Sequence, residues 1–223
     1  MTREIKVEKR VLSRNDVVAT RNRVGFTERG AYVVNMISSP GTGKTTILEA
    51  TLGRIVEAGR SVAVIEGDVQ TENDAVRVAA TGVPVEAVVT GGACHLDATM
   101  VGKAWQRLEP SLPAALDILI VENVGNLVCP SAYDVGEDEK VALVSVTEGE
   151  DKPLKYPALF NAATTCLVTK VDLLPYLEFD VEELVKNARA VNPALNIFLL
   201  SAKSGEGMDE WVEYLIGKAK DNS

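Results

Sequence analysis

The stretch that most constrains the fold of this chain is SSPGTGKTT, at residues 38–46. It follows an apolar run at 31–39, which is typical of a buried strand. It leads into 45–59, where apolar residues recur at helical spacing and Gly59 provides a stop signal. A glycine-rich turn between a strand and a helix leaves backbone N–H groups free to surround phosphate oxygens, and the helix dipole favours the same charge. The motif therefore predicts a phosphate-binding loop.

The rest of the chain alternates strands and helices. Apolar runs typical of buried strands recur at 61–68, 85–90, 117–125, 140–149, 164–172 and 196–202, and helix-compatible stretches include 95–108, 181–191 and 207–220. Near-continuous apolar strands that alternate with helices indicate a mostly parallel sheet covered on both faces. We expect an α/β fold of the three-layer P-loop NTPase type over residues 31–223. Residues 1–30 are polar and mixed in charge, so we predict an N-terminal arm that is helical in part.

Composition and charge narrow the classes of function. The net charge of −9 leaves no basic surplus for neutralising nucleic-acid phosphates. We expect no membrane span, because nowhere do about 18 apolar residues follow one another. The start, MTREIKVEKR, does not have the pattern of a signal peptide, and three cysteines do not form a disulfide framework. These features favour a reducing, cytoplasmic setting.

Each residue of the predicted loop has an expected task. Lys44 is placed to reach the β- and γ-phosphates, and the Thr45 hydroxyl to bind Mg²⁺. Ser38 stands where the first glycine of such loops usually lies. The predicted nucleotide-binding residues of the loop are Pro40, Gly41, Thr42, Gly43, Lys44, Thr45 and Thr46.

A second motif, TKVD at 169–172, ends a later strand and indicates which base is bound. The Asp172 carboxylate can accept hydrogen bonds from N1 and N2 of guanine, whereas adenine presents an acceptor at N1. Two charge-assisted bonds of about 1.5–3 kcal/mol each favour GTP strongly. The apolar stem of Lys170 can lie along the base, although Thr169 stands where asparagine is more usual. We expect the pocket to be completed by SAK, which is Ser201, Ala202 and Lys203.

Two further strand ends carry acidic residues, and the carboxyl ends of parallel strands are where ligands bind in such sheets. Glu122 is the expected carboxylate for Mg²⁺, either directly or through water, and the Gly125 N–H is placed to sense the γ-phosphate. Asp68 is a candidate for orienting Mg²⁺ or the attacking water, with a solvated turn or helix cap as the alternative. Lys44, Asp68, Glu122 and Gly125 form the predicted catalytic set.

The single histidine, His95, lies directly beside Cys94, and Cys129 follows Glu122 by seven residues. All three positions come after strands whose ends form one rim of the predicted sheet. Thiolate and imidazole ligands suit Zn²⁺, Ni²⁺ or copper, and two copies of the chain could complete a site that three ligands leave open. The alternative is structural, with His95 capping a helix and Cys129 packed in a loop. Cys166, inside a strand, is expected to be a core residue.

Six blocks of this sequence carry a family resemblance: SSPGTGKTT, GGACHLDA, IVENVGNLVCP, VTEGEDKPLKYP, TKVDLLPY and SAKSGEGMDEW. From about residue 31 to the C-terminus, the chain resembles the HypB family, the nickel-delivery GTPases of [NiFe]-hydrogenase maturation. The resemblance implies a GTPase of the signal-recognition-particle/MinD (SIMIBI) branch of P-loop proteins. It also implies a GTP-promoted homodimer with a Ni²⁺ or Zn²⁺ site at its interface. The implied partners are a HypA-type accessory protein and the hydrogenase large subunit.

Matching the family motifs to this sequence assigns Cys94, His95 and Cys129 as metal ligands, Lys44 and Thr45 to phosphate and Mg²⁺, and Asp172 to guanine. Some family members also carry an N-terminal cysteine motif or a histidine-rich stretch. The first 93 residues here contain neither residue type, so tight N-terminal nickel binding and nickel storage are not predicted.

These assignments lead to a hypothesis of coupling. GTP with Mg²⁺ would order the segment from Glu122 to Cys129 and the loop with Cys94 and His95, and hydrolysis would reverse the change. The motif positions offer no arginine finger or catalytic glutamine, so unassisted turnover is expected to be slow. The alternatives are a urease-accessory-type nickel GTPase, an ATP-dependent small-molecule kinase or ligase, and a structural dimerisation module.

Overall fold

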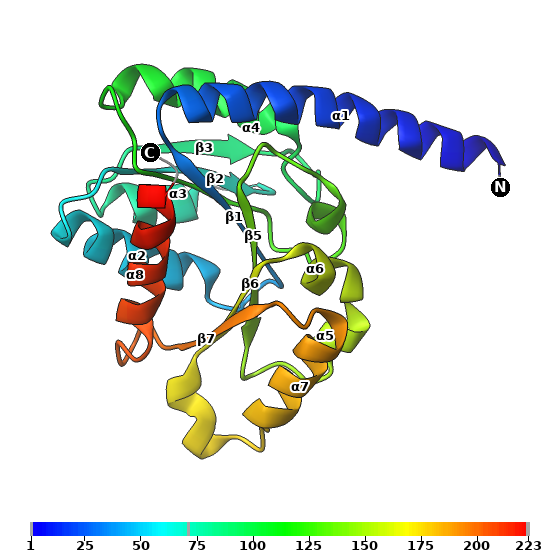
Figure 1. Cartoon of the computed structure of the whole chain (residues 1–223), viewed down its shortest axis with the longest axis vertical. Helices are drawn as coiled ribbons and strands as arrows, with labels where there is room; N and C mark the ends of the chain where they lie inside the picture. The colour runs from blue at the N-terminus through cyan, green and yellow to red at the C-terminus, as the bar shows by residue number, and fades with distance from the viewer. Residues whose placement is uncertain (1, 71, 222–223) are drawn as a thin grey trace.

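All strands of the protein run parallel in one sheet, in the order β3-β2-β4-β1-β5-β6-β7 (Figure 1). The computed structural model describes residues 2–70 and 72–221, with the side chains of 2–10 and 221 left aside. Residues 1, 71, 222 and 223, which fall within the predicted arm and domain, lie outside the described residues. The strands are β1 (Tyr32–Ser38), β2 (Val62–Asp68), β3 (Val85–Val89), β4 (Ile118–Glu122), β5 (Glu139–Ser145), β6 (Thr165–Thr169) and β7 (Asn196–Leu200).

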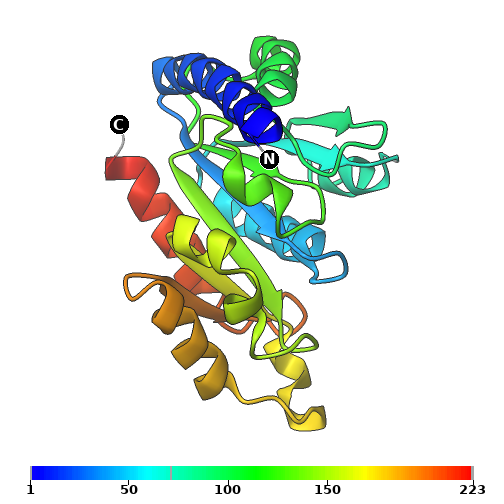
Figure 2. The same cartoon turned by 90° about the vertical axis from the view of Figure 1, so that its right-hand side faces the viewer.

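Helices cover both faces of this sheet, so the predicted three-layer α/β fold is confirmed (Figure 2). One face packs against α2 (Lys44–Glu57), α3 (Asn73–Ala79) and α8 (Met208–Asp221). The other packs against α1 (Thr2–Glu28), α4 (Ala98–Leu108), α6 (Pro157–Ala162) and α7 (Val181–Val191), with the short α5 (Lys152–Lys155) beside α7. Short 3₁₀ turns are η1 (Glu109–Ser111), η2 (Cys129–Ala132) and η3 (Val171–Tyr176).

The strands are fully buried on both faces where the sheet is covered, which explains their continuous apolar runs. Each of the seven expected strand regions contains one strand, and most strands end earlier than the apolar run does. Residues 171–172 belong to η3 and not to the strand before it, and residues 146–149 form a turn after β5. The motif residues therefore lie at the carboxyl ends of the strands, or in the loops and first helical turns that follow them.

The N-terminal arm is the long helix α1, whose last turns lie alongside α4 while its first turns extend past the body of the molecule (Figure 1). Its buried side chains include Ala19 and Phe26 but also two asparagines, Asn15 and Asn22. Because polar residues fill half of this contact, the sequence shows no apolar stripe there. Phe26 meets Trp105 of α4 edge-on, with ring centroids 5.0 Å apart.

The order of strands places the site. β1 is the central strand and lies between β4 and β5. The strands β2 to β4 lie on one side of β1 and β5 to β7 on the other, so the direction in which strands are added reverses beside β1. Open parallel sheets bind ligands in the crevice that such a reversal creates at the carboxyl ends. Among the described residues, no helix is both long and apolar enough to cross a membrane.

Candidate functional site

The phosphate-binding loop borders a cavity of about 430 Å³ at the carboxyl end of the sheet. The predicted residues Pro40 to Thr46 line one side, and Glu66, Asp68 and Gly125 line the other. Gly41 and Gly43 have φ angles of +78° and +92°, a left-handed conformation that glycine adopts without steric cost. Ser38, at the position of the usual first glycine, belongs to β1 and needs no such conformation. The loop of this chain therefore tolerates serine there.

Lys44 and Thr45 converge on Glu122 from the first turn of α2. The Lys44 Nζ lies 2.8 Å from Glu122 Oε1, and the Thr45 hydroxyl donates to the same oxygen at 2.7 Å. Glu122 is only 1% exposed, and its other carboxylate oxygen, Oε2, has no hydrogen-bond partner. An ionised carboxylate buried in this way needs compensating positive charge. The three predicted residues are thus brought together around one carboxylate.

A second buried carboxylate, Glu66, was missed in the sequence. Glu66 on β2 stands directly across the parallel ladder from Glu122 on β4, and its Oε2 is also unpartnered. Burial, and then the charge of Glu122, raise the pKa of Glu66 to about 8. Glu66, Asp68 and Asp74 each offer a carboxylate oxygen within 4.8 Å of the others. An acidic residue inside the apolar run 61–68 was the signal that could have found it.

Asp68 and Arg77 complete this side of the cavity. The Asp68 carboxylate accepts hydrogen bonds from the backbone N–H groups of Val69 and, at 3.4 Å, of Gln70. Arg77 of α3, which belongs to none of the sequence motifs, lines the same cavity and is held by Glu49 at 2.6 Å. It therefore points its charge at an acidic residue of α2 in this state.

The residues predicted to recognise the base line a second cavity, of about 220 Å³. Asp172 Oδ1 accepts a hydrogen bond from the buried Ser201 hydroxyl at 2.6 Å, which fixes the orientation of the carboxylate. Ala202 and Lys203 line the same space. A carboxylate oxygen has two lone pairs, so both oxygens of Asp172 remain able to accept from a base.

Thr169 and Lys170 connect this cavity to the phosphate loop. The Thr169 hydroxyl donates to the Thr42 carbonyl at 2.7 Å, and the Lys170 Nζ donates to the Gly41 carbonyl at 2.7 Å. Lys170 adopts a left-handed backbone (φ +63°), which is strained for a residue with a side chain and is tolerated mainly at functional sites. Thr169 thus makes the contact between the two motifs from the position where asparagine is more usual.

Cys94, His95 and Cys129 lie together on the adjoining part of the rim. The Cys94 and Cys129 sulfurs are 3.1 Å apart, Cys94 Sγ is 3.7 Å from His95 Nδ1, and each residue offers a donor atom within 4.8 Å of the others. The neighbouring Cys129 thiol raises the pKa of the Cys94 thiol, and burial lowers the pKa of His95. A neutral imidazole is the form that binds metals.

The structural alternative for His95 does not fit the geometry. The N-cap of α4 is Asp97, whose carboxylate accepts from the Met100 N–H at 2.8 Å, so His95 does not cap that helix. The His95 ring instead packs against the Tyr133 ring, with centroids 4.0 Å apart and the ring planes tilted by 40°. Cys166 is fully buried in β6, as expected, and burial raises its pKa to about 12.

The segment after β4 joins the phosphate site to the cysteine pair. Gly125 packs so closely on Pro40 that an added Cβ would lie 3.2–3.3 Å from three Pro40 atoms. One residue later, the Asn126 side chain donates to the Cys94 carbonyl at 3.2 Å. The buried Asn123 accepts from the Leu96 N–H at 2.9 Å. These two asparagines were not identified from the sequence.

The chain is similar to several known proteins in sequence and fold. A profile of the family described as "CobW/HypB/UreG, nucleotide-binding domain" matches residues 32–199. The hydrogenase maturation factor HypB of Escherichia coli K12 is 56% identical over 216 residues, or 96% of this chain and 72% of that protein. The crystal structure of Helicobacter pylori HypB in complex with nickel matches with a TM-score of 0.88 and 38% identity, covering 94% of this chain and 96% of that one. HypB from Archaeoglobus fulgidus gives a TM-score of 0.84 and 38% identity, covering 93% of this chain and all of that one (100%).

These matches cover the phosphate loop, the base motif and both cysteine segments in one continuous stretch of the chain. They confirm the resemblance drawn from the motifs. The chain therefore belongs to the HypB family of hydrogenase maturation factors, within the CobW/HypB/UreG group of P-loop nucleotide-binding proteins.

Proposed function

We propose that this protein is a GTP-hydrolysing metallochaperone that carries nickel for [NiFe]-hydrogenase maturation, and that the bound nucleotide controls its hold on the metal. Support comes from the family, from the nickel complex of the Helicobacter pylori relative, and from the thiol and imidazole donors beside the nucleotide cavity. The observation that carries the proposal is the segment Glu122–Cys129, which contacts both sites.

The nucleotide is bound by groups with separate tasks. The backbone N–H groups of residues 40–46 would surround the β- and γ-phosphates, and the Lys44 ammonium would leave Glu122 to meet their charge. The Asp172 carboxylate, oriented by Ser201, would accept from N1 and N2 of guanine and exclude adenine. The stem of Lys170 would lie along the base. Thr169, through its hydrogen bond to the Thr42 carbonyl, would hold the base pocket in place relative to the phosphate loop.

The residues around Glu122 fit a hard divalent cation such as Mg²⁺. Two buried carboxylate oxygens there, one from Glu66 and one from Glu122, have no partner, and the Thr45 hydroxyl is 2.7 Å from the Glu122 carboxylate. Oxygen donors of this kind suit Mg²⁺. Thr45 and Glu122 would hold the ion with Asp68 nearby, and when bound it would neutralise charge on the phosphates. Asp68 and the Gly125 N–H would orient the attacking water and the γ-phosphate respectively.

Turnover without a partner is expected to be slow. Among the described residues that line the phosphate cavity, Arg77 is the one arginine, and Glu49 and Asp74 hold it. A free arginine or a positioned glutamine accelerates hydrolysis in P-loop switches by large factors. Slow hydrolysis would thus set how long the protein stays in the GTP-bound state before it changes to the GDP-bound state.

The segment after β4 can transmit that change. A γ-phosphate at Gly125 would press on a residue already packed against Pro40, and the displacement would move Asn126, which binds the Cys94 carbonyl. Three residues further on, Cys129 lies 3.1 Å from Cys94. The distance between the two sulfurs, and so the affinity for metal, would then depend on the nucleotide.

The cargo site is completed in an assembly. Cys94, His95 and Cys129 supply three donors for Ni²⁺, and Zn²⁺ suits the same set. Cys94 is exposed, and so is Val128 beside Cys129, which allows a second copy to add its own donors. We therefore propose a GTP-promoted homodimer with the metal at its interface. A HypA-type accessory protein and the hydrogenase large subunit would receive the nickel in the cytoplasm, where thiols stay reduced.

Replacing Cys129 by alanine tests the nickel site, and replacing Cys166 by alanine is the control. The Cys129→Ala variant should lose nickel stoichiometry, measured by metal analysis of protein eluted from a size-exclusion column in GDP and in a non-hydrolysable GTP analogue. Cys166→Ala removes the same atoms from the core and should leave nickel binding unchanged. Full nickel occupancy in Cys129→Ala would exclude this thiol from the site.

A further inference from the structure

The two chain segments that carry the metal donors are bound to each other through α1. The first segment runs from Cys94 into α4, and its backbone is held at Ala98. The second runs from Cys129 through η2 to residues 134 and 135. Both segments contact the same face of α1, on which Asn15 and Asn22 are spaced by seven residues, or about two helical turns.

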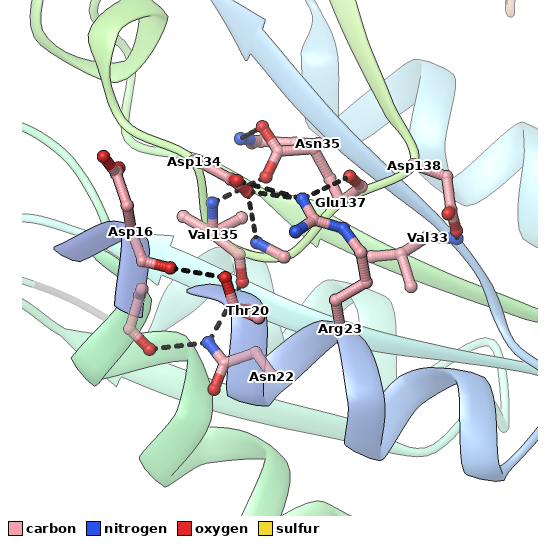
Figure 3. Close-up of polar contacts among 12 residues, drawn as sticks. Asp16, Thr20, Asn22, Arg23, Val33, Asn35, Asp134, Val135, Glu137 and Asp138 are labelled. Atoms are coloured by element: carbon pink, nitrogen blue, oxygen red, sulfur yellow. Dashed lines mark hydrogen bonds and ion pairs between the residues drawn. The ribbon is translucent and has the colours of Figure 1, made fainter. Parts of the chain in front are cut away.

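Each asparagine bridges both segments with one side-chain amide. Asn22 donates to the Ala98 carbonyl at 2.7 Å. It also donates to the Val135 carbonyl at 3.0 Å (Figure 3). Asn15 accepts from the Ala98 N–H at 2.9 Å and donates to the Asp134 carbonyl at 2.7 Å. Four hydrogen bonds therefore set the distance between Ala98 and residues 134–135, and all four come from α1.

The packing around Asn22 leaves little freedom for the points at which α1 holds the two segments, Ala98 and residues 134–136. An added Cβ on Gly102 of α4 would lie 2.5 Å from Asn22 Oδ1, and one on Gly136 would lie 2.9 Å from Asn22 Cβ. Gly136 also has a φ of +101°, so two glycines, one in each segment, allow the close approach to Asn22. On the next residue of α1, Arg23 binds the Asp134 carboxylate at 2.9 Å (Figure 3). Asn15, Asn22 and Arg23 thus form a bracket, a set of α1 contacts that holds both segments in place.

We propose that Asn15 and Asn22 are positioning residues that hold the metal donors of the two segments within reach of one ion. The inference rests on the proposed metal site, and it gives the N-terminal helix a role in that site. Ala98 comes only three positions after His95 in the chain, and Asp134 comes five positions after Cys129. A change at the bracket would therefore reach the donors over a short length of chain, and the Tyr133 ring against His95 limits how far either segment can shift.

The test compares two asparagines with the same local chemistry. Asn22→Leu removes two hydrogen bonds to carbonyls of two segments, and Asn192→Leu does the same at the carbonyls of Phe160 and Ala163 (3.1 and 2.9 Å), neither of which lies in a segment that carries a metal donor. Two properties are measured in the full chain. One is nickel affinity from the thiolate-to-nickel charge-transfer absorption. The other is the equilibrium of the metal-free Cys94–Cys129 dithiol with oxidised glutathione, in which one protein disulfide and two reduced glutathiones form.

We expect Asn22→Leu to lower nickel affinity at least tenfold, to change the charge-transfer spectrum and to lower the effective concentration of the thiol pair at least tenfold. Affinity for GDP should stay within twofold, and Asn192→Leu should leave the metal and thiol values within twofold. Wild-type values in Asn22→Leu, or equal losses in Asn192→Leu, would overturn the proposal. If Asn22→Leu does not fold, Asn15→Ala decides, with a loss of at least threefold expected and wild-type values refuting it.

The thiol measurement separates this inference from the proposed function. If the wild-type protein binds no nickel, the metallochaperone proposal fails, but the glutathione equilibrium still reports whether α1 sets the spacing of the two segments. An unchanged equilibrium in the variant would then refute the bracket alone.

Discussion

Replacing Asp172 by asparagine should exchange guanine for xanthine as the preferred base. In the proposed complex the carboxylate would face the N1 and N2 donors of guanine, and the Ser201 hydroxyl, which donates to it at 2.6 Å, orients it. The side-chain amide in the Asp172→Asn variant would keep one acceptor and turn one donor toward the N2 amino group, so one bond weakens and the other becomes a donor–donor contact. At about 1.5–3 kcal/mol per charge-assisted bond, the total loss is about 3–5 kcal/mol. This corresponds to roughly a 10²–10⁴-fold weaker affinity for GDP.

Xanthine has a donor at N1 and an acceptor at position 2, which match the two ends of an amide. The variant should therefore bind XDP more tightly than GDP. Competition of GDP, XDP and ADP against a fluorescent nucleotide measures all three affinities. Asp209→Asn makes the same charge change at an 82%-exposed side chain paired with Arg54 and should bind GDP normally. Loss of less than threefold in GDP affinity, with no gain for XDP, would refute the assignment of Asp172 to the base.

Two other substitutions test the phosphate side of the site. The added methyl group in Gly125→Ala would press on Pro40 and should slow GTP hydrolysis at least fivefold in a phosphate-release assay. The control is Gly53→Ala, in open space on α2, which should leave the rate unchanged and stabilise the fold by about 0.5–1 kcal/mol. Equal hydrolysis rates in the two variants would contradict the close packing of Gly125 on Pro40. The raised pKa of Glu66, about 8, means that the folded state keeps a proton that the unfolded state has lost above pH about 4.5, so its stability falls as pH rises through 8. Without nucleotide or metal, the free energy of unfolding that Glu66→Gln gains over wild type should grow between pH 5 and pH 8 and level off above pH 8, at on the order of a few kcal/mol in denaturant unfolding. A gain independent of pH would show that Glu66 is ionised throughout.

The sheet and the phosphate loop could be predicted from the sequence because both depend on local patterns. Strands buried on two faces produce apolar runs, and a strand–glycine–helix turn has a fixed spacing of residues. The sequence also placed Cys94, His95 and Cys129 on one rim, since all three follow strands that end at the same edge. It could not show that the sulfurs meet, because this depends on β4 lying between β1 and β2.

The parts that were missed depend on contacts between distant segments. Residues 1–30 showed no core face because Asn15 and Asn22 occupy it, and an asparagine that bridges two backbones has the sequence pattern of a surface residue. Asn126 was overlooked for the same reason, since its partner is the Cys94 carbonyl and not a side chain. Glu66 was hidden inside an apolar run, where its neighbour Glu122 becomes visible only in the strand register.

The central claim is that the segment Glu122–Cys129 couples nucleotide to metal, and nickel affinity in two nucleotide states tests it most directly. Equilibrium titrations of the wild-type protein with GDP and with a non-hydrolysable GTP analogue should give nickel affinities that differ at least fivefold. Asn126→Ala, which removes the hydrogen bond to Cys94 from a partly exposed side chain, should reduce that difference to less than twofold. Identical nickel affinities with both nucleotides in the wild-type protein would contradict the account.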